Sequence, residues 1–192
     1  MGNKSIYKSD LLVGLGGDPM GYAGTGNQEI KACVAVIFLV DGPGSKVLMM
    51  KRSERDDDDW SGQIAFPGGR CEKGDARYLD TAIRETNEEM GFELLSSEFL
   101  GYLKPLNTNK SGLTVLPCIF WIERHVAIKP NKEEVSSYKW VPTSVFLAGS
   151  EDQSMKVSAH GIQIEAPAIA YEGYVIWGLT YRILKSILSL FS

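Results

Sequence analysis

Three glutamates, Glu85, Glu88 and Glu89, stand close together in the sequence. On an α-helix, which turns by about 100° per residue, they occupy adjoining positions on one part of the surface. Carboxylates clustered in this way repel one another unless a cation or an arginine neutralises them. Mg²⁺ prefers oxygen ligands and suits carboxylates that act together with substrate phosphates. The cluster therefore indicates a divalent metal site, and the alternative is a solvated acidic helix face, which is common in proteins.

Arg84 precedes Glu88 by four residues and is expected to form an ion pair with it on a helix. A helix is predicted over Ala76–Met90, with Asp75 as its N-cap and Gly91 as the residue that ends it. The residues that recur there at helical spacing are Leu79, Ala82, Ile83, Thr86 and Met90. The prediction is an amphipathic helix that carries its carboxylates beside the apolar set.

Strands are predicted for much of the remaining chain. Ile30–Val40 and Lys46–Lys51 are rich in β-branched and large apolar residues, and the turn Asp41–Gly44 between them predicts a hairpin. The other predicted elements are strands in Leu94–Leu103, Leu113–Glu123 and Ser137–Val141, a hairpin in Lys156–Glu165, and helices over Pro142–Leu147 and Trp177–Phe191. Because strands and helices do not alternate regularly, the sequence predicts an α+β fold rather than a doubly wound sheet.

The composition is that of an ordinary globular protein. The chain has 192 residues, of which 44% are hydrophobic and 23% charged, and this length favours one domain, alone or with extensions. Residues 1–29 contain seven glycines and little apolar periodicity. We therefore expect a glycine-rich, loop-rich N-terminal arm, followed by one domain over residues 30–192. The net charge of −4 disfavours a broad basic surface for nucleic acid.

Cysteine usage and hydropathy favour a cytoplasmic protein. Cys33, Cys71 and Cys118 are widely spaced and form no CxxC pair, which favours reduced structural cysteines over a zinc or redox site. The first residues lack the long apolar run of a signal peptide. The longest apolar stretch, Ala32–Val40, is too short to cross a bilayer, so no membrane partner is expected.

The segment from Gly69 to Phe92 strongly resembles the signature of the Nudix hydrolase family, written GX5EX7REUXEEXGU. The residues at signature positions are Gly69, Arg84, Glu85, Glu88, Glu89 and Gly91, with Phe92 as the closing apolar residue. Three features depart from it. Asp75 stands where Glu is usual, one extra residue separates it from Arg84, and Thr86 replaces an aliphatic residue. The first two departures also occur in a branch of the family that resembles coenzyme A diphosphatases.

The resemblance to this branch extends beyond the signature. The segment Gly62-x3-Phe66-Pro67-Gly68-Gly69 matches the upstream part of the coenzyme A diphosphatase signature, and Ile176–Thr180 also looks like a segment of that branch. Met50 and Asp57, however, stand where that signature has Thr and Arg. Coenzyme A or an acyl derivative is the leading substrate implied. ADP-ribose, other nucleotide sugars, dinucleoside polyphosphates and damaged nucleotides remain open.

For fold and reaction, the resemblance implies a Nudix-type α/β/α sandwich with a mixed β-sheet. It also implies hydrolysis of a nucleoside diphosphate linked to another moiety, with Mg²⁺ or Mn²⁺ as the cofactor. Such ions neutralise the diphosphate charge and lower the pKa of bound water. Glu85 and Glu89 are expected to ligate the metal, and Glu88 to be a further ligand or to act through Arg84.

Other residues are assigned around this centre. The carbonyl of Gly69 is expected to complete the metal shell, because a glycine turn lets the backbone approach an ion closely. Asp75 is expected to hold a metal-bound water. The candidates for the general base are Glu85, Glu89 and the loop residue Glu134. The residues predicted to contact the substrate are Arg52, Arg55, Phe66 and Gly68.

Two alternatives to this enzyme remain. A catalytically silent Nudix module would bind a nucleotide or a protein, and loss of a signature carboxylate would favour it, whereas Glu85, Glu88 and Glu89 are all present. A nucleic-acid processor is disfavoured by the net charge of −4. The expected partner is thus a small nucleoside diphosphate derivative, and a homodimer is a family-level expectation.

Overall fold

A computed structural model describes residues 5–15, 29–55, 60–108, 112–147, 153–159 and 162–191. Three features of the sequence lie outside these residues. They are the glycines between positions 16 and 28, the segment Asp56–Asp59 with the signature departure at Asp57, and His160 and Gly161 in the middle of the predicted hairpin Lys156–Glu165.

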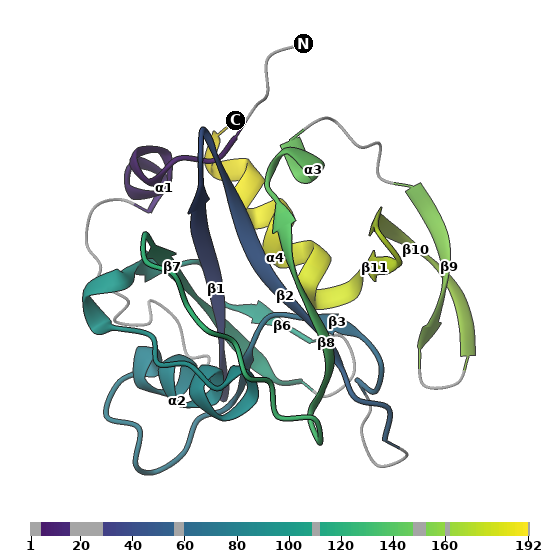
Figure 1. The fold of residues 1–192 in the computed structure, drawn as a ribbon. Coiled ribbons are helices and arrows are strands. Elements are labelled where there is room, and N and C mark those ends of the chain that lie inside the picture. The colour runs from purple at the N-terminus through teal and green to yellow at the C-terminus, as the bar shows by residue number, and fades with distance from the viewer. Residues whose placement is uncertain are drawn as a thin grey trace.

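Strand β1 (Ala32–Asp41) is the central strand of the main sheet (Figure 1). Strand β2 (Gly44–Arg52) runs antiparallel to it across a tight turn, which confirms the predicted hairpin. Strand β7 (Thr114–Ile122) pairs with the other edge of β1 and runs parallel to it, so the sheet is mixed. The remaining strands of this sheet are β3 (Ile64–Ala65), β4 (Gly68–Arg70), β5 (Phe99–Tyr102), β6 (Leu106–Asn107) and β8 (Val135–Pro142).

A second, smaller sheet has the order β11-β10-β9. Strands β9 (Gln153–Ala159) and β10 (Ile162–Tyr171) form the hairpin predicted from the sequence, and β11 (Tyr174–Ile176) pairs with the end of β10. Figure 1 shows β9 and β10 at one side of the molecule, beyond helix α4.

Helices α2 (Tyr78–Met90) and α4 (Gly178–Leu188) cover opposite faces of the main sheet. Successive side chains of β1 alternate between these faces. Ala35 and Ile37 pack in the core on the α2 side, whereas Val36 and Phe38 pack on the α4 side. A strand buried on both faces has a continuous apolar sequence, as β1 does. The molecule is an α/β/α sandwich of the α+β class, which confirms the predicted fold.

Two short helices complete the structure, α1 (Lys8–Gly14) and α3 (Ser144–Leu147), together with 3₁₀ turns at Ser96–Glu98 and Ser189–Phe191. Helix α1 lies in the segment for which the sequence predicted loops. Its Leu11 is fully buried in the α4-side core, and Ile6 just before it is 3% exposed there. A helix of seven residues contributes too few core-facing side chains for a periodic signal to be recognised.

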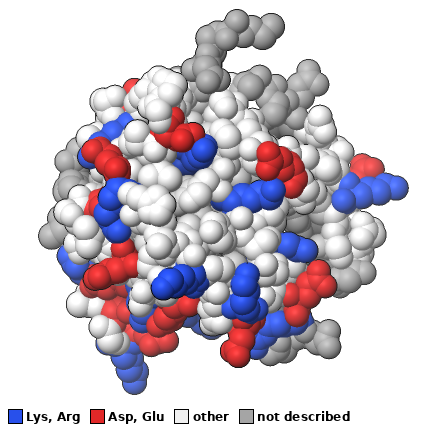
Figure 2. Space-filling view, in the orientation of Figure 1, with Lys and Arg blue, Asp and Glu red and all other residues white. Residues whose placement is uncertain are grey.

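Charged side chains of both signs are interspersed on the face that Figure 2 shows, where Lys and Arg alternate with Asp and Glu rather than forming one basic field. In the described part of the chain, no helix is long and apolar enough to span a membrane.

Candidate active site

Helix α2 begins two residues later than predicted. Its N-cap is Arg77, and the Arg77 backbone N–H donates to the Asp80 carboxylate at 2.9 Å. Asp75 was expected to cap the helix and does not, because its carboxylate is already occupied by Arg84 and Thr81. The predicted end of the helix is confirmed. Gly91 takes a left-handed conformation with φ 68°, which glycine adopts without strain.

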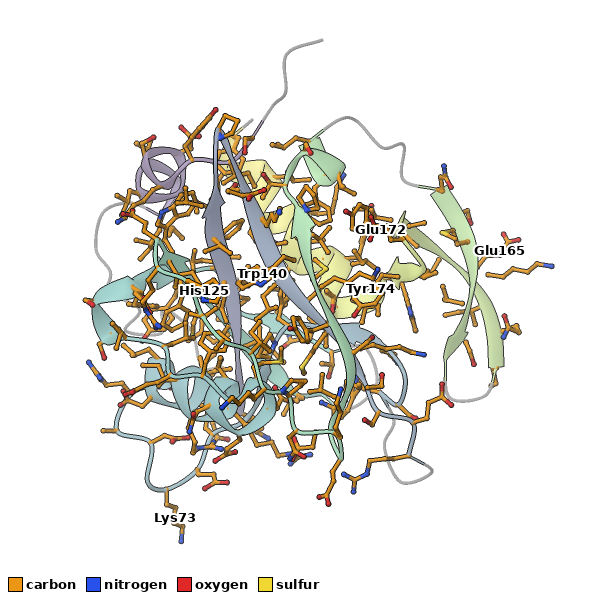
Figure 3. The ribbon with its side chains drawn as sticks, in the orientation of Figure 1. Lys73, His125, Trp140, Glu165, Glu172 and Tyr174 are labelled. Carbon is orange, nitrogen blue, oxygen red and sulfur yellow. The ribbon has the colours of Figure 1, made fainter. Side chains whose placement is uncertain are left out.

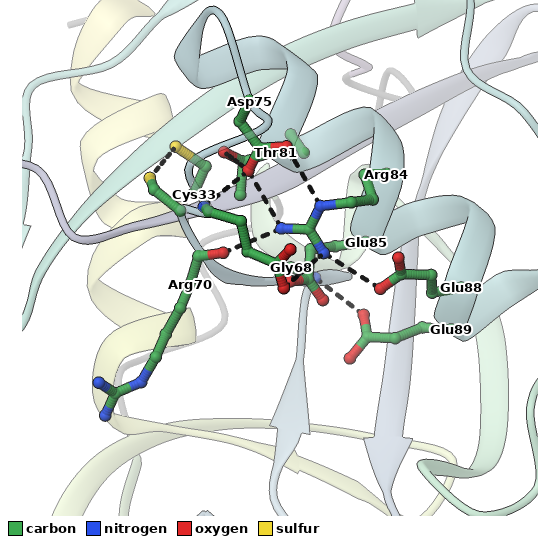
Figure 4. Close-up of polar contacts among 12 residues, drawn as sticks. Cys33, Gly68, Arg70, Asp75, Thr81, Arg84, Glu85, Glu88 and Glu89 are labelled. Carbon is green, nitrogen blue, oxygen red and sulfur yellow. Dashed lines mark hydrogen bonds and ion pairs between the residues drawn. The ribbon is translucent and has the colours of Figure 1, made fainter.

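Arg84 connects the carboxylates at the start and end of α2 (Figure 4). Its guanidinium donates to Asp75 at 3.1 and 3.2 Å, to Glu85 at 2.9 Å and to Glu88 at 3.1 Å. It also donates to the backbone carbonyl of Arg70 at 3.0 Å. The contact with Glu88 confirms the predicted pair. A single cation thus partly neutralises three acidic side chains and ties the helix to strand β4.

Asp75 fixes the orientation of this arginine. Besides Arg84, its carboxylate accepts the Thr81 hydroxyl at 2.8 Å and the Glu72 backbone N–H at 2.9 Å. The hydrogen bond from Arg84, helped by these two donors, lowers the pKa of Asp75 to about 2. The structure therefore shows Asp75 as a partner of Arg84, and its role as a ligand of metal-bound water stays a prediction. The sequence analysis did not single out Thr81. Its position one helical turn before Arg84 places the two side chains on the same part of the helix surface, where they can share a partner.

Glu85 lies against Gly69 of β4, where the sequence predicted a turn and the structure has a short strand. Its side chain is 15% exposed, and burial raises its pKa above the ordinary value. A Cβ atom at Gly69 would overlap the Glu85 carboxylate. The Gly69 backbone and this carboxylate therefore come very close together, and an alanine at this position would require the flexible Glu85 side chain to move.

Glu89 is the most deeply buried carboxyl group of the site, with 1% of the residue exposed. One of its oxygens accepts the backbone N–H of Gly68 at 2.8 Å, and the other lies 3.6 Å from Nη1 of Arg52. Burial nevertheless dominates and raises the pKa of Glu89 to about 8. Unless a cation with more charge than Arg52 binds beside it, this carboxyl group holds a proton at neutral pH.

Gly68 is required by the close approach of β4 to β1. It adopts φ 156° and pairs with Val34, and a Cβ atom there would overlap the carbonyl of Cys33. This tight packing directs the Gly68 N–H at Glu89. Its predicted contact with substrate stays a prediction.

Glu134 comes to the site from the loop before β8. Its negative charge contributes to the raised pKa of both Glu85 and Glu89, so the three carboxylates lie within electrostatic reach of one another. Its backbone carbonyl accepts the N–H of Ser53 at 2.8 Å, which holds the loop against the end of β2. The structure thus brings this sequence-distant candidate base close to the helix.

Two of the residues predicted to contact the substrate do not contact the carboxylates described above. Phe66 is 2% exposed and packs in the core on the α4 side, a position that favours a packing role. Arg55 is exposed and lines a cavity beside Lys51. Arg52, by contrast, lies 3.6 Å from Glu89, and its contact with substrate stays a prediction.

The donor set fits a hard divalent cation. Among the described residues, no three His, Cys, Asp or Glu side chains are already spaced to enclose a metal ion. However, Glu89 is buried and Glu85 half-buried, both have raised pKa values, and the backbone of Gly69 approaches the Glu85 carboxylate closely. Oxygen donors of this kind are the ligands that Mg²⁺ and Mn²⁺ take in proteins.

Comparison with known families agrees with this geometry. Residues 31–159 match the NUDIX domain, and the chain therefore belongs to the Nudix hydrolase family. Members of this family generally use divalent metal ions.

A relative from Yersinia pestis, named as the uncharacterized Nudix hydrolase NudL, is 34% identical over 125 residues. The match covers 65% of this chain and 62% of that relative, so it spans less than two thirds of the relative's length.

Solved structures show the same fold. The NUDIX domain of Shewanella oneidensis NrtR, complexed with ADP ribose, has a TM-score of 0.55 at 14% identity, over 97% of this chain and all of that one. A MutT/nudix family protein from Enterococcus faecalis has a TM-score of 0.58 at 13% identity, over 86% of this chain and 64% of that one. At these identities the likeness concerns the fold alone.

Proposed function

We propose that this protein hydrolyses the diphosphate bond of a nucleoside diphosphate linked to another moiety, with Mg²⁺ or Mn²⁺. The observation that carries this proposal is the buried carboxyl group of Glu89 together with the half-buried one of Glu85, one turn apart on α2 and packed against Gly68 and Gly69 of β4. Burying two acids in this way disfavours their charged forms. A cation bound between the two carboxyl groups would favour their charged forms and offset this cost.

Glu85, Glu89 and the carbonyl of Gly69 would hold the ion, and Glu88 would be a further ligand or act through Arg84. When bound, a divalent ion would neutralise diphosphate charge and lower the pKa of a bound water. Arg84 keeps Glu85 and Glu88 oriented through bonds of 2.9 and 3.1 Å.

Around this centre, Arg52 would bind a phosphate oxygen from its place beside Glu89. Glu134, Glu85 and Glu89 remain the candidates to take a proton from the attacking water at a carboxylate oxygen. Glu134 differs from the other two because it lies on a loop and is not needed as a ligand.

Coenzyme A or an acyl derivative is the first substrate to test, because the segments around Phe66 and Trp177 resemble the coenzyme A diphosphatase branch. ADP-ribose is the second, since the structurally similar Shewanella domain was solved with it. Nucleotide sugars and dinucleoside polyphosphates complete the group. A cytoplasmic location, consistent with three free cysteines, is part of the proposal.

The test is a hydrolysis panel of these compounds and nucleoside triphosphates, with Mg²⁺ or Mn²⁺ and mass-spectrometric detection of products. Glu89→Gln is the inactive control. Release of 4′-phosphopantetheine and adenosine 3′,5′-bisphosphate supports the coenzyme A assignment, whereas preference for another compound would redirect the substrate and keep the reaction. Absence of metal-dependent turnover throughout would overturn the proposal in favour of a silent nucleotide-binding module.

A second variant tests the metal site itself. Gly69→Ala places a methyl group where the Glu85 carboxylate lies, and the flexible carboxylate must move. We expect a folded protein whose apparent metal affinity falls by about 10–100-fold, the usual effect of disturbing how a ligand is held. Gly74→Ala is the matched control, because a Cβ there meets nothing within 4 Å. Equal metal affinity in both variants would contradict the assignment of Glu85.

A further inference from the structure

The stretch 131–134, directly before β8, forms a tight turn that carries Glu134. The Asn131 carbonyl accepts the backbone N–H of Glu134 at 3.1 Å and that of Val135 at 2.8 Å. Val135 is the first residue of β8 and is fully buried. Glu134 is therefore held between a buried strand on one side and Asn131 on the other.

The same turn is bonded to the C-terminal end of α2. The backbone N–H of Asn131 donates to the carbonyl of Glu89 at 2.9 Å. Two residues earlier, the N–H of Lys129 donates to the carbonyl of Met90 at 2.9 Å. The last carbonyls of a helix have no partner within the helix, so these bonds satisfy groups that would otherwise need water or a cap. Gly91 permits the approach, because a Cβ there would overlap the carbonyl of Lys129.

The side chain of Asn131 makes two different bonds in this turn. Its Oδ1 accepts the backbone N–H of Glu133 at 3.1 Å, an Asx-turn bond that both Asn and Asp can form. Its Nδ2 donates to a carboxylate oxygen of Glu134 at 3.4 Å. The first bond shapes the backbone, whereas the second is directed at the carboxylate. An aspartate would keep the first bond and lose the second, because it has no N–H to donate.

The Glu134 carboxylate faces two other acids. Burial raises the pKa of Glu85 and of Glu89, and the negative charge of Glu134 adds to both shifts. Like charges repel, so an unrestrained Glu134 side chain would turn away from them. A hydrogen bond from an amide opposes this movement. Because the amide is neutral, it orients the carboxylate without supplying the positive charge that Arg84 supplies to Glu85.

We propose that Asn131 is a positioning residue that acts through Glu134. The inference rests on the proposed function and selects Glu134 among its three candidate bases. The O–H bond of the attacking water breaks, and its proton goes to a carboxylate oxygen of Glu134. The water oxygen bonds to phosphorus as the diphosphate bond breaks. Bonds to a catalytic group are often long without substrate and shorten in the complex, which agrees with the distance of 3.4 Å.

Two substitutions of Asn131 separate its two bonds. Asn131→Ala loses both and should melt about 2–4 °C below wild type, whereas Asn131→Asp keeps the turn and should melt within about 1 °C of it. Activity should not follow stability. In Asn131→Asp an oxygen that repels Glu134 replaces Nδ2, so kcat should fall about 10–100-fold, at least as far as in Asn131→Ala. KM and apparent metal affinity should stay within about twofold of wild type.

A double-mutant cycle tests whether Asn131 acts through Glu134. Glu134→Gln should lower kcat by about 10²–10⁴-fold, the usual contribution of a general base. The variant that combines it with Asn131→Asp should be no slower, because the effect of a positioning residue vanishes once its target is gone. Asn87→Asp, exposed on α2, controls for the added charge. Glu165→Gln controls for the exchange of Glu for Gln, since Figure 3 shows Glu165 on the outer side of the β9–β10 hairpin.

The inference would be overturned if Asn131→Asp kept the kcat of Asn87→Asp, or if its effect multiplied with that of Glu134→Gln. NMR of the metal-free protein tests the contact without turnover. The side-chain amide signal of Asn131, assigned with Asn131→Asp, should shift in Glu134→Gln and not in Glu165→Gln. A wild type that hydrolyses nothing refutes the proposed reaction and the inference with it. Hydrolysis by the wild type without this NMR shift refutes the inference alone, so the two failures can be told apart.

Discussion

Glu89 makes the stability of the metal-free protein depend on pH. Burial raises its pKa from 4.5 to about 8, so the folded protein retains a proton that the unfolded chain releases in this range. A raised carboxyl pKa means that stability declines as the pH rises from about 4.5 through 8. Glu89→Gln abolishes the titration and keeps an oxygen for the Gly68 N–H.

In EDTA, we therefore expect Glu89→Gln to be more stable than wild type at pH 9, by a free energy of unfolding on the order of 3 kcal/mol. At pH 5 the two proteins should be nearly equal. Calorimetric melts at both pH values measure this, with the exposed Glu133→Gln as control. A stability difference that is the same at pH 5 and pH 9 would refute the raised pKa.

Asp75 has the opposite pH dependence. Its pKa is lowered from 3.8 to about 2 by Arg84, so its ionised form stabilises the fold above pH 3.8, and this contribution is lost as the pH falls through 2. Asp75→Asn should lower the free energy of unfolding by about 2 kcal/mol at pH 7. Urea titrations at pH 7 and pH 2.5 check this, and the difference from wild type should shrink at the lower pH.

The residues around Arg84 show how far sequence reasoning reaches. Its pair with Glu88 was predicted because residues four apart meet on any helix, and the structure confirms it. Its bonds to Asp75 were not predicted. Nine positions and a loop separate the two residues, so helical geometry does not relate them. The same loop explains why Asp75 was wrongly expected to cap α2.

At the scale of elements, the end of α2 is held by Gly91. Its backbone has φ 68°, and a Cβ there would overlap the carbonyl of Lys129. Gly91→Ala should therefore lower the free energy of unfolding by about 1–3 kcal/mol, through backbone strain and the displaced neighbour. Chemical denaturation measures it, with Gly74→Ala in the loop before α2 as the control. Equal losses in the two variants would show that Gly91 has no special role.

The elements whose apolar residues recur with a clear periodicity were predicted correctly. The β1–β2 hairpin, α2 and the β9–β10 hairpin all occur where the sequence predicted them, because apolar periodicity and turn residues mark each one. Strands β3 and β4 were missed as strands. Each has two or three residues, and they form only because β2 and β1 offer edges for pairing.

At the scale of the whole molecule, helix α1 is part of the core rather than an accessory. Leu11 is fully buried on the α4 side, whereas Val13 on the same helix is 83% exposed. Leu11→Ala should lower the free energy of unfolding by about 2–5 kcal/mol, as buried leucines usually do, and Val13→Ala by less than about 0.5 kcal/mol. Thermal melts of both variants test this, and equal behaviour would show that α1 does not contribute to the core.

The division into an arm over 1–29 and a domain over 30–192 stays a prediction, as does the homodimer. The burial of Ile6 and Leu11 indicates that at least residues 5–15 fold together with the rest of the chain. Composition alone could not show this, because the glycines of the segment dominate its sequence while two apolar side chains supply its packing.

The parallel pairing of β1 with β7 also affects the order in which the protein can fold. Ala32 pairs with Val115, which lies 83 positions later in the chain. Such distant partners must meet before their contacts can stabilise the fold, which slows refolding relative to a chain with mainly local contacts. During synthesis, β1 leaves the ribosome well before its central partner exists. The carboxylates of α2 are therefore made early, but the sheet against which α2 packs is completed only after β7 and β8 have emerged.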